Sequence, residues 1–171
     1  MQNVRVRPAT PGDLDEIVAV FLGCWRETYA AVLPQRTVDL MTDEKAHALW
    51  GRVVSESEPG DLLVAHAAAP EQLLGVARTA PVVAGTGHLA SLYVRPQAQG
   101  MGVGRLLMDA ALERLERSGA RSATLWVFRD NAPSLAFYRH LGWEPDGEER
   151  TQPEFGEPEL RLARTLGREG R

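Results

Sequence analysis

The chain has 171 residues, of which 44% are hydrophobic and 25% are charged, and its formal net charge is −4. These fractions are ordinary for a soluble globular protein, and the length suits one domain that buries roughly 68–70% of its unfolded surface without a metal or disulfide staple. The single cysteine, Cys24, excludes an intrachain disulfide framework and a zinc site built from several cysteines.

Several targeting and binding classes are also disfavoured. The longest apolar stretch near the start, residues 17–25, has nine residues, whereas a membrane-spanning helix needs about 20. No secretory signal pattern is visible, so we expect the cytoplasm. The basic residues, eighteen Arg and one Lys, are spread along the chain, which argues against a nucleic-acid surface. The one lysine, Lys45, follows Glu44, so the chain has no GxxxxGK[ST] phosphate loop.

The first half of the chain predicts one strand and two helices. Residues 4–7 alternate like an edge strand, and residues 13–29 carry apolar side chains at helical spacing. Pro34 interrupts this helix. A second helix follows from about Thr42, which can cap it, to near Ser57.

The second half predicts mostly strands. A hairpin is expected over 62–67 and 73–81, then a strand over 88–94 and a helix over 102–118. Val103, Leu106, Leu107 and Ala110 are predicted to form the buried stripe of that helix. The remaining predicted elements are a strand over 123–128, a helix over 133–141 and two closing strands over 143–151 and 159–163. We expect a single domain over 1–166 and a frayed tail over 167–171.

The segment 94–105 joins a predicted strand to a predicted helix and has glycines at three alternate positions, Gly100, Gly102 and Gly104. Each glycine costs roughly 1 kcal/mol relative to alanine in a helix interior, so a compensating role is expected. The first N–H groups of a helix have no internal partner and lie at the positive end of its dipole. The loop therefore indicates a phosphate or pyrophosphate site. Arg105 stands where GxGxxG requires its third glycine, which excludes that dinucleotide fingerprint.

Two motifs resemble the GNAT N-acetyltransferase superfamily. Gln99-x-x-Gly102-x-Gly104 matches its Q/RxxGxG/A signature, and residues 131–143 match N-x-x-[AS]-x-x-[FL]-Y-x-x-x-G-[FW]. The resemblance is specific from about His88 to Trp143. It implies an α+β (α/β) fold with a mixed, mostly antiparallel central sheet of about seven strands flanked by four helices. It also implies transfer of an acetyl group from acetyl-CoA to a primary amine of a small molecule or peptide, in one ternary complex.

The resemblance further implies a cofactor site. The backbone at Leu92, Tyr93 and Val94 would hold the pantetheine arm, with an N–H near Val94 facing the thioester oxygen, where negative charge develops. The loop would hold the pyrophosphate through the backbone N–H groups of Gln99, Gly100, Met101, Gly102, Val103, Gly104 and Arg105. No metal is implied, and His47, His66 and His140 lack the spacing of metal ligands.

The helix after Asn131 carries the expected acid. Asn131, Ser134 and Tyr138 are spaced to share one helix face. By resemblance, Asn131 and Ser134 contact the cofactor, and Tyr138 protonates the departing thiolate, since a phenol is protonated at neutral pH. The alternative for Tyr138 is a core side chain whose hydroxyl bonds a carbonyl.

The general base is expected at His88. Many members of the superfamily have a glutamate six residues before the position of Val94, and His88 stands there in this chain. A neutral imidazole can accept the amine proton directly or through water. The alternatives are a water relay to bulk solvent and an ordinary histidine at a strand end.

The acceptor pocket is expected to be walled by Trp25 and Tyr29, one helical turn apart, and by Phe128. A core aromatic pair is the alternative for Trp25 and Tyr29. Cys24 is expected to be an inert buried thiol, and Glu27 a solvated helix charge.

Two rival functions remain open at the level of sequence. A non-catalytic acyl-CoA-binding sensor would keep the glycine loop and lose the acid, so the presence of Tyr138 and Asn131 favours the enzyme. A partner-binding α/β domain with an accidental loop match is the second rival. No nucleic-acid or membrane partner is expected. Homodimerisation is common in the superfamily, so a second copy of the chain is considered as a partner.

Overall fold

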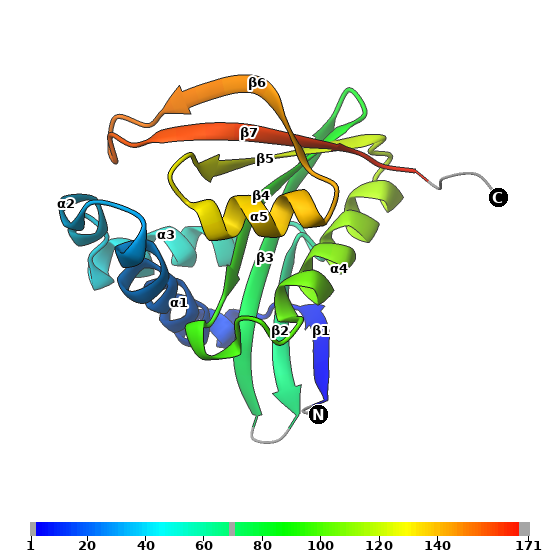
Figure 1. Cartoon of the computed structure of the whole chain (residues 1–171). Helices are drawn as coiled ribbons and strands as arrows, with labels where there is room; N and C mark the ends of the chain where they lie inside the picture. The colour runs from blue at the N-terminus through cyan, green and yellow to red at the C-terminus, as the bar shows by residue number, and fades with distance from the viewer. Residues whose placement is uncertain (1–2, 69–70, 168–171) are drawn as a thin grey trace.

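A computed structural model describes residues 3–68 and 71–167. One seven-stranded sheet, in the order β1-β2-β3-β4-β5-β7-β6, carries helices on both faces (Figure 1). The strands are β1 (Val4–Pro8), β2 (Leu62–Ala68), β3 (Glu71–Val83), β4 (Thr86–Val94), β5 (Ser122–Phe128), β6 (Glu144–Thr151) and β7 (Pro158–Thr165). The α-helices are α1 (Leu14–Gly23), α2 (Gln35–Asp39), α3 (Asp43–Glu56), α4 (Val103–Arg117) and α5 (Ala132–His140).

This architecture confirms the predicted fold class and the order of the predicted elements. The short helix α2 was not predicted, because Pro34 was interpreted as an interruption, whereas it stands directly before this helix as its N-cap. The predicted cap at Thr42 is present, and its hydroxyl accepts the N–H of Lys45 at 3.2 Å. Of the tail expected over 167–171, residues 168–171 lie outside the described residues.

The predicted helix over 13–29 is continuous but changes its winding. It begins as a 3₁₀ turn (Pro11–Asp13), continues as α1, widens to a π-helix (Cys24–Thr28) and tightens again to 3₁₀ (Tyr29–Ala31). π-turns are rare and frequently occur at functional sites. This one carries Cys24 and Trp25, both buried.

The sheet is antiparallel except where β4 meets β5. These two strands pair in parallel only through Thr86–His88 and Ser122–Thr124. β4 then continues to Val94 and β5 to Phe128 without pairing to each other. The sheet is therefore forked, and His88 lies at the point where the fork opens.

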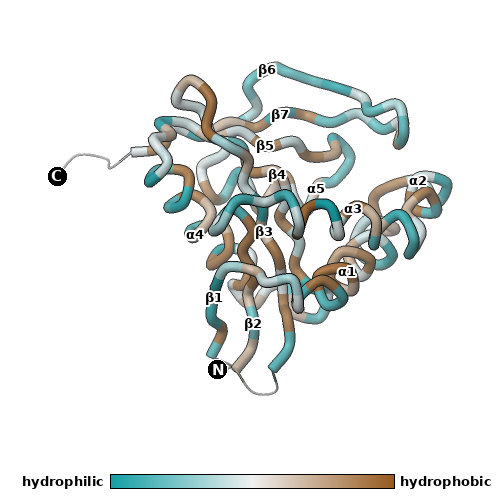
Figure 2. The backbone as a smooth tube through the Cα atoms, turned by 180° about the vertical axis from the view of Figure 1, so that it is seen from behind, coloured by the Kyte–Doolittle hydropathy of each residue, from teal (hydrophilic) through white to brown (hydrophobic). Residues whose placement is uncertain are grey.

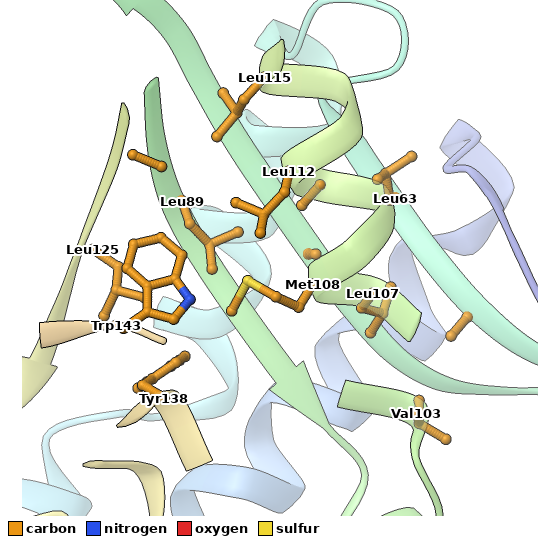
Figure 3. Close-up of a cluster of buried hydrophobic side chains, with 14 of the residues drawn as sticks. Leu63, Leu89, Val103, Leu107, Met108, Leu112, Leu115, Leu125, Tyr138 and Trp143 are labelled. Atoms are coloured by element: carbon orange, nitrogen blue, oxygen red, sulfur yellow. The ribbon is translucent and has the colours of Figure 1, made fainter. Parts of the chain in front are cut away.

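Two hydrophobic clusters hold the helices to the sheet. α4 and α5 cover one face, where Tyr138 and Trp143 lie close to Leu125 (Figure 3). α1 and α3 cover the other face and bury Phe21 and Trp50. The edge strand β6 is hydrophilic along most of its length (Figure 2) and fully exposed.

The predicted stripe of α4 is wrong at Leu106, which is 44% exposed. Val103 and Leu107 are buried as predicted, and Ala110 is half-buried. The buried face continues instead through Met108, Ala111, Leu112 and Leu115. The face that α4 turns to the sheet is thus rotated toward Met108, which leaves Leu106 on its outer margin.

A β-bulge in β4 decides which side chains face which cluster. Ser91 pairs with Arg78 and Leu89 pairs with Thr79, so Ala90 is an extra residue without a partner on β3. Because side chains alternate along a strand, an extra residue inverts the alternation. Leu89 and Leu92 therefore both pack toward α4 although they are three residues apart.

Candidate functional site

A cavity of about 790 Å³ lies at the fork of the sheet. Its walls come from β4, β5, the end of α1, the glycine loop, α5 and the hairpin β6–β7. Most of the predicted site residues line it together: Trp25, Tyr29, His88, Leu92, Tyr93, Val94, Gln99, Gly100, Gly102, Gly104, Arg105, Phe128, Asn131, Ser134 and Tyr138. Of the other two, Met101 is 55% exposed and Val103 is buried in the core, so neither side chain belongs to the lining.

The β4 wall of the cavity is a strand edge that β5 leaves unpaired. From Leu89 to Val94 the side of β4 away from β3 has no strand partner within the described residues. Such an edge offers N–H and C=O groups to an extended ligand with amide groups. The Val94 carbonyl is already engaged, because it accepts the Cys24 thiol at 3.0 Å and the Gln99 amide at 3.1 Å.

The glycine loop presents free N–H groups at the start of α4. Gly100 and Gly102 have φ of +77° and +83°, a conformation that favours glycine. The N–H groups of Gln99 and Met101 are donated within the loop, to Pro96 and Ala98. In the described part of the chain, the N–H groups of Gly100 and of 102–105 have no acceptor. These groups are free to bind an anion, as the glycine pattern predicts.

Gly104 has a different reason to be glycine. A Cβ there would lie 3.2 Å from Cζ of Phe137 and 3.5 Å from Cγ2 of Val94. Its small size therefore lets the start of α4 pack closely against α5 and β4.

Tyr138 lines the cavity although the residue is only 9% exposed. Burial raises the pKa of its hydroxyl above the ordinary value, so the hydroxyl is protonated at neutral pH. Within the described residues, burial alone raises this pKa and no hydrogen bond contributes, which gives no support to the alternative of a hydroxyl bonded to a carbonyl. Asn131 caps α5, since its Oδ1 accepts the N–H of Ser134 at 3.2 Å.

His88 is half-buried on the cavity side of β4. Its Nδ1 lies 3.0 Å from Oγ1 of Thr124, across the last rung of the β4–β5 pairing. Burial lowers the pKa of His88, and the positive charge of Arg150 lowers it further. A lowered pKa keeps the imidazole neutral near pH 7, the form that accepts a proton.

Aromatic rings form a wall opposite the fork. The ring centroids of Trp25 and Tyr29 are 5.1 Å apart, and Tyr29 lies 5.7 Å from Phe128. The unpredicted Phe155 completes the wall, 5.2 Å from Trp25. Trp25 and Tyr29 are thus packed together and also line the cavity, so the two interpretations of this pair are compatible.

Cys24 does not have the properties of a nucleophile. Burial raises the pKa of its thiol to about 12, so the thiol stays protonated. Glu27 is exposed, as expected for a solvated helix charge.

The sequence interpretation missed the charged group on the far side of the cavity. Arg150 donates from Nε to Oε2 of Glu159 at 2.7 Å, and Gln152 donates to the same oxygen at 3.0 Å. The Arg150 guanidinium lies over the ring of Trp126, 4.3 Å from its centroid. The only signal in the sequence was a set of polar residues on two strands that were predicted merely as closing strands.

Within the described residues, no helix is long and apolar enough to cross a membrane. No group of three or more His, Cys, Asp or Glu side chains there is placed to hold a metal ion.

Comparisons with known proteins agree with this geometry. The pattern of the Acetyltransferase (GNAT) family matches residues 17–143. A spermidine N(1)-acetyltransferase of Thermoplasma acidophilum is 24% identical over 144 residues, which are 83% of this chain and 89% of the relative. A mycothiol acetyltransferase of Gordonia bronchialis is 37% identical over 117 residues, 68% of this chain but 35% of the relative. The crystal structure of a PaiA N-acetyltransferase from T. acidophilum with coenzyme A shares the fold, with a TM-score of 0.74 at 20% identity over 96% of this chain and 99% of that one.

Proposed function

Since the chain belongs to the GNAT family of acetyltransferases and is an acyltransferase of that type, we propose that it transfers the acetyl group of acetyl-CoA to a primary amine of a small molecule or peptide. The amine attacks the thioester directly, with both substrates bound at the same time. Relatives named for spermidine and for mycothiol support an amine-bearing acceptor.

One observation carries the proposal: the unpaired edge of β4 runs directly into the free N–H groups of the glycine loop. The edge suits the amides of a pantetheine arm, and the loop suits a pyrophosphate at the positive end of α4. The two features are consecutive in the chain, so one extended ligand can use both. Arg105 lines the same end of the cavity and adds a positive charge.

The chain's own groups divide the remaining work. His88, neutral and facing the cavity, accepts the proton of the attacking amine directly or through water. A backbone N–H of β4 near Val94 donates to the thioester oxygen as negative charge develops there. Tyr138 donates its hydroxyl hydrogen to the departing sulfur. Its raised pKa keeps the hydroxyl protonated until the sulfur departs, and the proton balance closes when the tyrosinate takes up, through solvent, the proton that the amine has lost.

A covalent enzyme intermediate has no support. Cys24 is the one thiol in the chain, and it is buried, protonated and bonded to the Val94 carbonyl. Direct attack by the amine needs only the groups described above.

The test measures thiol release from acetyl-CoA with a panel of amines, alongside calorimetric titration of coenzyme A. We expect coenzyme A to bind and at least one amine to release thiol. Tyr138→Phe should lower turnover by about 100-fold, the order given by general acid catalysis, while the Kd for coenzyme A stays within twofold.

Other outcomes would decide against parts of the proposal. Binding of coenzyme A without turnover on any amine would favour the sensor module. A loss of less than threefold in Tyr138→Phe would remove the acid role of Tyr138. No binding of coenzyme A at all would overturn the proposal.

A further inference from the structure

We propose that the acceptor is a small molecule that carries a carboxylate as well as the reacting amine, and that Arg150 binds this carboxylate. The inference rests on the proposed acetyl transfer and adds the substrate class. It depends on three features of the acceptor end of the cavity: the turn that bounds one side of it, the orientation of Arg150 and the charges around His88.

The turn between β6 and β7 bounds one side of the acceptor end. Phe155 of this turn packs on Trp25 of the helical layer. Glu157, 8% exposed, accepts the hydroxyl of Thr37 and the guanidinium of Arg36, each at 3.2 Å. The hairpin is thus pinned to α2 across the cavity. A space bounded on these sides suits a small molecule better than a lysine on the surface of a folded protein.

Arg150 is held so that its two terminal nitrogens remain free. Its Nε is bonded to Glu159, which is 6% exposed, and its guanidinium plane rests on Trp126. Gln152 donates to the same Glu159 oxygen and so fixes the carboxylate. Within the described residues, Nη1 and Nη2 of Arg150 have no hydrogen-bond partner. A fixed guanidinium fork with two free donors binds a carboxylate in a bidentate manner.

The position of Arg150 fits a carboxylate near the reacting amine. Trp126 is two residues beyond Thr124, so the ring under Arg150 lies about 7 Å along β5 from the His88 rung. The charges that lower the pKa of His88 are those of Arg150, Arg161 and Arg78. Arg150 and Arg161 are paired with Glu159 and Asp146, so among the described residues this end of the cavity offers a polycation no unpaired carboxylate, whereas the free Nη donors of Arg150 suit an acceptor with a negative group.

The remaining wall suggests what else the acceptor carries. Glu159 is the only carboxylate among the described residues that line the cavity, and Arg150 already neutralises it. The rings of Trp25, Tyr29, Phe128 and Phe155 lie alongside. An amino acid with an apolar side chain fits all three parts of this end: its carboxylate meets Arg150, its amine faces His88, and its side chain lies on the aromatic rings.

The test compares acceptors that differ only in the carboxylate. The pairs are L-phenylalanine with 2-phenylethylamine and L-leucine with isopentylamine, and L-phenylalaninamide removes the charge alone. Spermidine and a lysine-containing peptide represent the other classes. Thiol release is measured at saturating acetyl-CoA, and kcat/KM is expressed per neutral amine because the amine pKa values differ. We expect at least a tenfold preference for one amino acid over its decarboxylated partner and, for phenylalanine, over the amide.

Variants assign this preference to residues. In Arg150→Gln, the ratio of kcat/KM for an amino acid to kcat/KM for its decarboxylated partner should fall close to one. Glu159→Gln should raise the KM for the amino acid several-fold with a smaller change in kcat, because Glu159 only positions Arg150. Arg129→Gln is the matched control, since Arg129 is exposed and outside the cavity lining. An unchanged Kd for coenzyme A verifies that each variant is folded.

The outcomes separate this inference from the proposed function. Faster turnover of both decarboxylated amines, of spermidine or of the peptide would overturn the carboxylate while leaving acetyl transfer intact. A preference that persists in Arg150→Gln would overturn the role of Arg150. Absence of thiol release with every amine, together with no binding of coenzyme A, would instead overturn the proposed function.

Discussion

His88 is the residue at which the chemistry depends most on surroundings that the sequence does not show. Its imidazole is half-buried, and Nδ1 lies 3.0 Å from Oγ1 of Thr124. In the tautomer in which Nδ1 donates to Thr124, Nε2 is free to accept a proton, as the proposed base role requires. Sequence comparison could place His88 at the strand position where related proteins have a glutamate. It could not show that the neighbouring charges are arginines, because these come from other strands.

The lowered pKa of His88 has a consequence for the pH profile. As the proposed base, His88 must be neutral, so we expect activity to fall as the pH drops through its pKa, which burial and the charge of Arg150 hold below the ordinary value of histidine. We expect kcat/KM at saturating acetyl-CoA, again per neutral amine, to show an acidic limb below pH 6.5. His88→Ala should remove this limb and lower kcat by about 100-fold, the order of a general base. The measurement is initial-rate kinetics from pH 5 to 9.

The control is His47→Ala, because His47 is exposed on α3 and does not line the cavity. Its profile should match that of the unaltered enzyme. If His88→Ala keeps the same limb, the proton leaves through water to bulk solvent, and His88 has no part in the mechanism.

The pairing of Arg150 with Glu159 could not be predicted from residue patterns in the sequence. The register places Phe128 opposite Glu159 and Glu159 opposite Arg150, so three strands contribute to one row. Such a row exists only once the hairpin β6–β7 has paired with β5. A glutamate nine residues after an arginine predicts nothing by itself, whereas Tyr138 and the glycines belong to local motifs and were predictable.

Among the elements, the glycine loop and α5 were the most predictable, since each carries a local sequence motif. The sequence grouped the three glycines under one role, and the structure separates them. Gly100 and Gly102 need positive φ, whereas Gly104 is needed for the contact with Phe137. The difference depends on α5, which is distant in sequence.

The different roles of Gly102 and Gly104 predict that substitutions at the two positions have different effects, one on coenzyme A binding and one on thermal stability. In Gly102→Val the new side chain meets open space, but a β-branched residue resists φ of +83°. The loop must therefore rearrange, and we expect the Kd for coenzyme A to rise by at least tenfold. Gly104→Ala should mainly lower Tm, because its Cβ presses on Phe137 while its N–H stays free. Titration calorimetry and thermal unfolding measure the two effects.

The reverse pattern would contradict this assignment. If Gly102→Val bound coenzyme A normally and Gly104→Ala did not, the pyrophosphate would depend on the close packing of α4 rather than on the shape of the loop.

At the scale of the whole molecule, the fork divides the sheet into a four-stranded part and a three-stranded part. Direct pairing between them is limited to the three residue pairs from Thr86 to His88, and the cluster under α4 and α5 supplies the rest. The order of elements predicted a mixed sheet, but the length of the parallel contact could not be predicted. The length of this contact depends on where β4 and β5 diverge in the folded sheet, which neither strand's own sequence specifies.

A ligand that lies in the fork and contacts both parts should stabilise the molecule as a unit. At free coenzyme A of 100 times Kd, binding contributes about 2.7 kcal/mol. For a chain of this size we expect Tm to rise by about 5–10 °C. Hydrogen exchange should slow over residues 89–94 of β4 and over 99–105.

The edge formed by β1 and β2 is the internal control, because it lies far from the fork in the strand order. Slower exchange confined to that edge, or no rise in Tm under saturating coenzyme A, would contradict a binding site in the fork.

The unpaired Ala90 makes the length of β4 as important as its composition. Deleting this small residue would restore strict alternation to the strand. With Val94 paired to Gly75, the residues before the deletion would change faces: His88 would point into the hydrophobic layer beneath α4, and Leu89 would take its place at the cavity. Removing one residue would thus replace the proposed base by a hydrocarbon side chain, so the number of residues in this strand constrains the site as strictly as their identity.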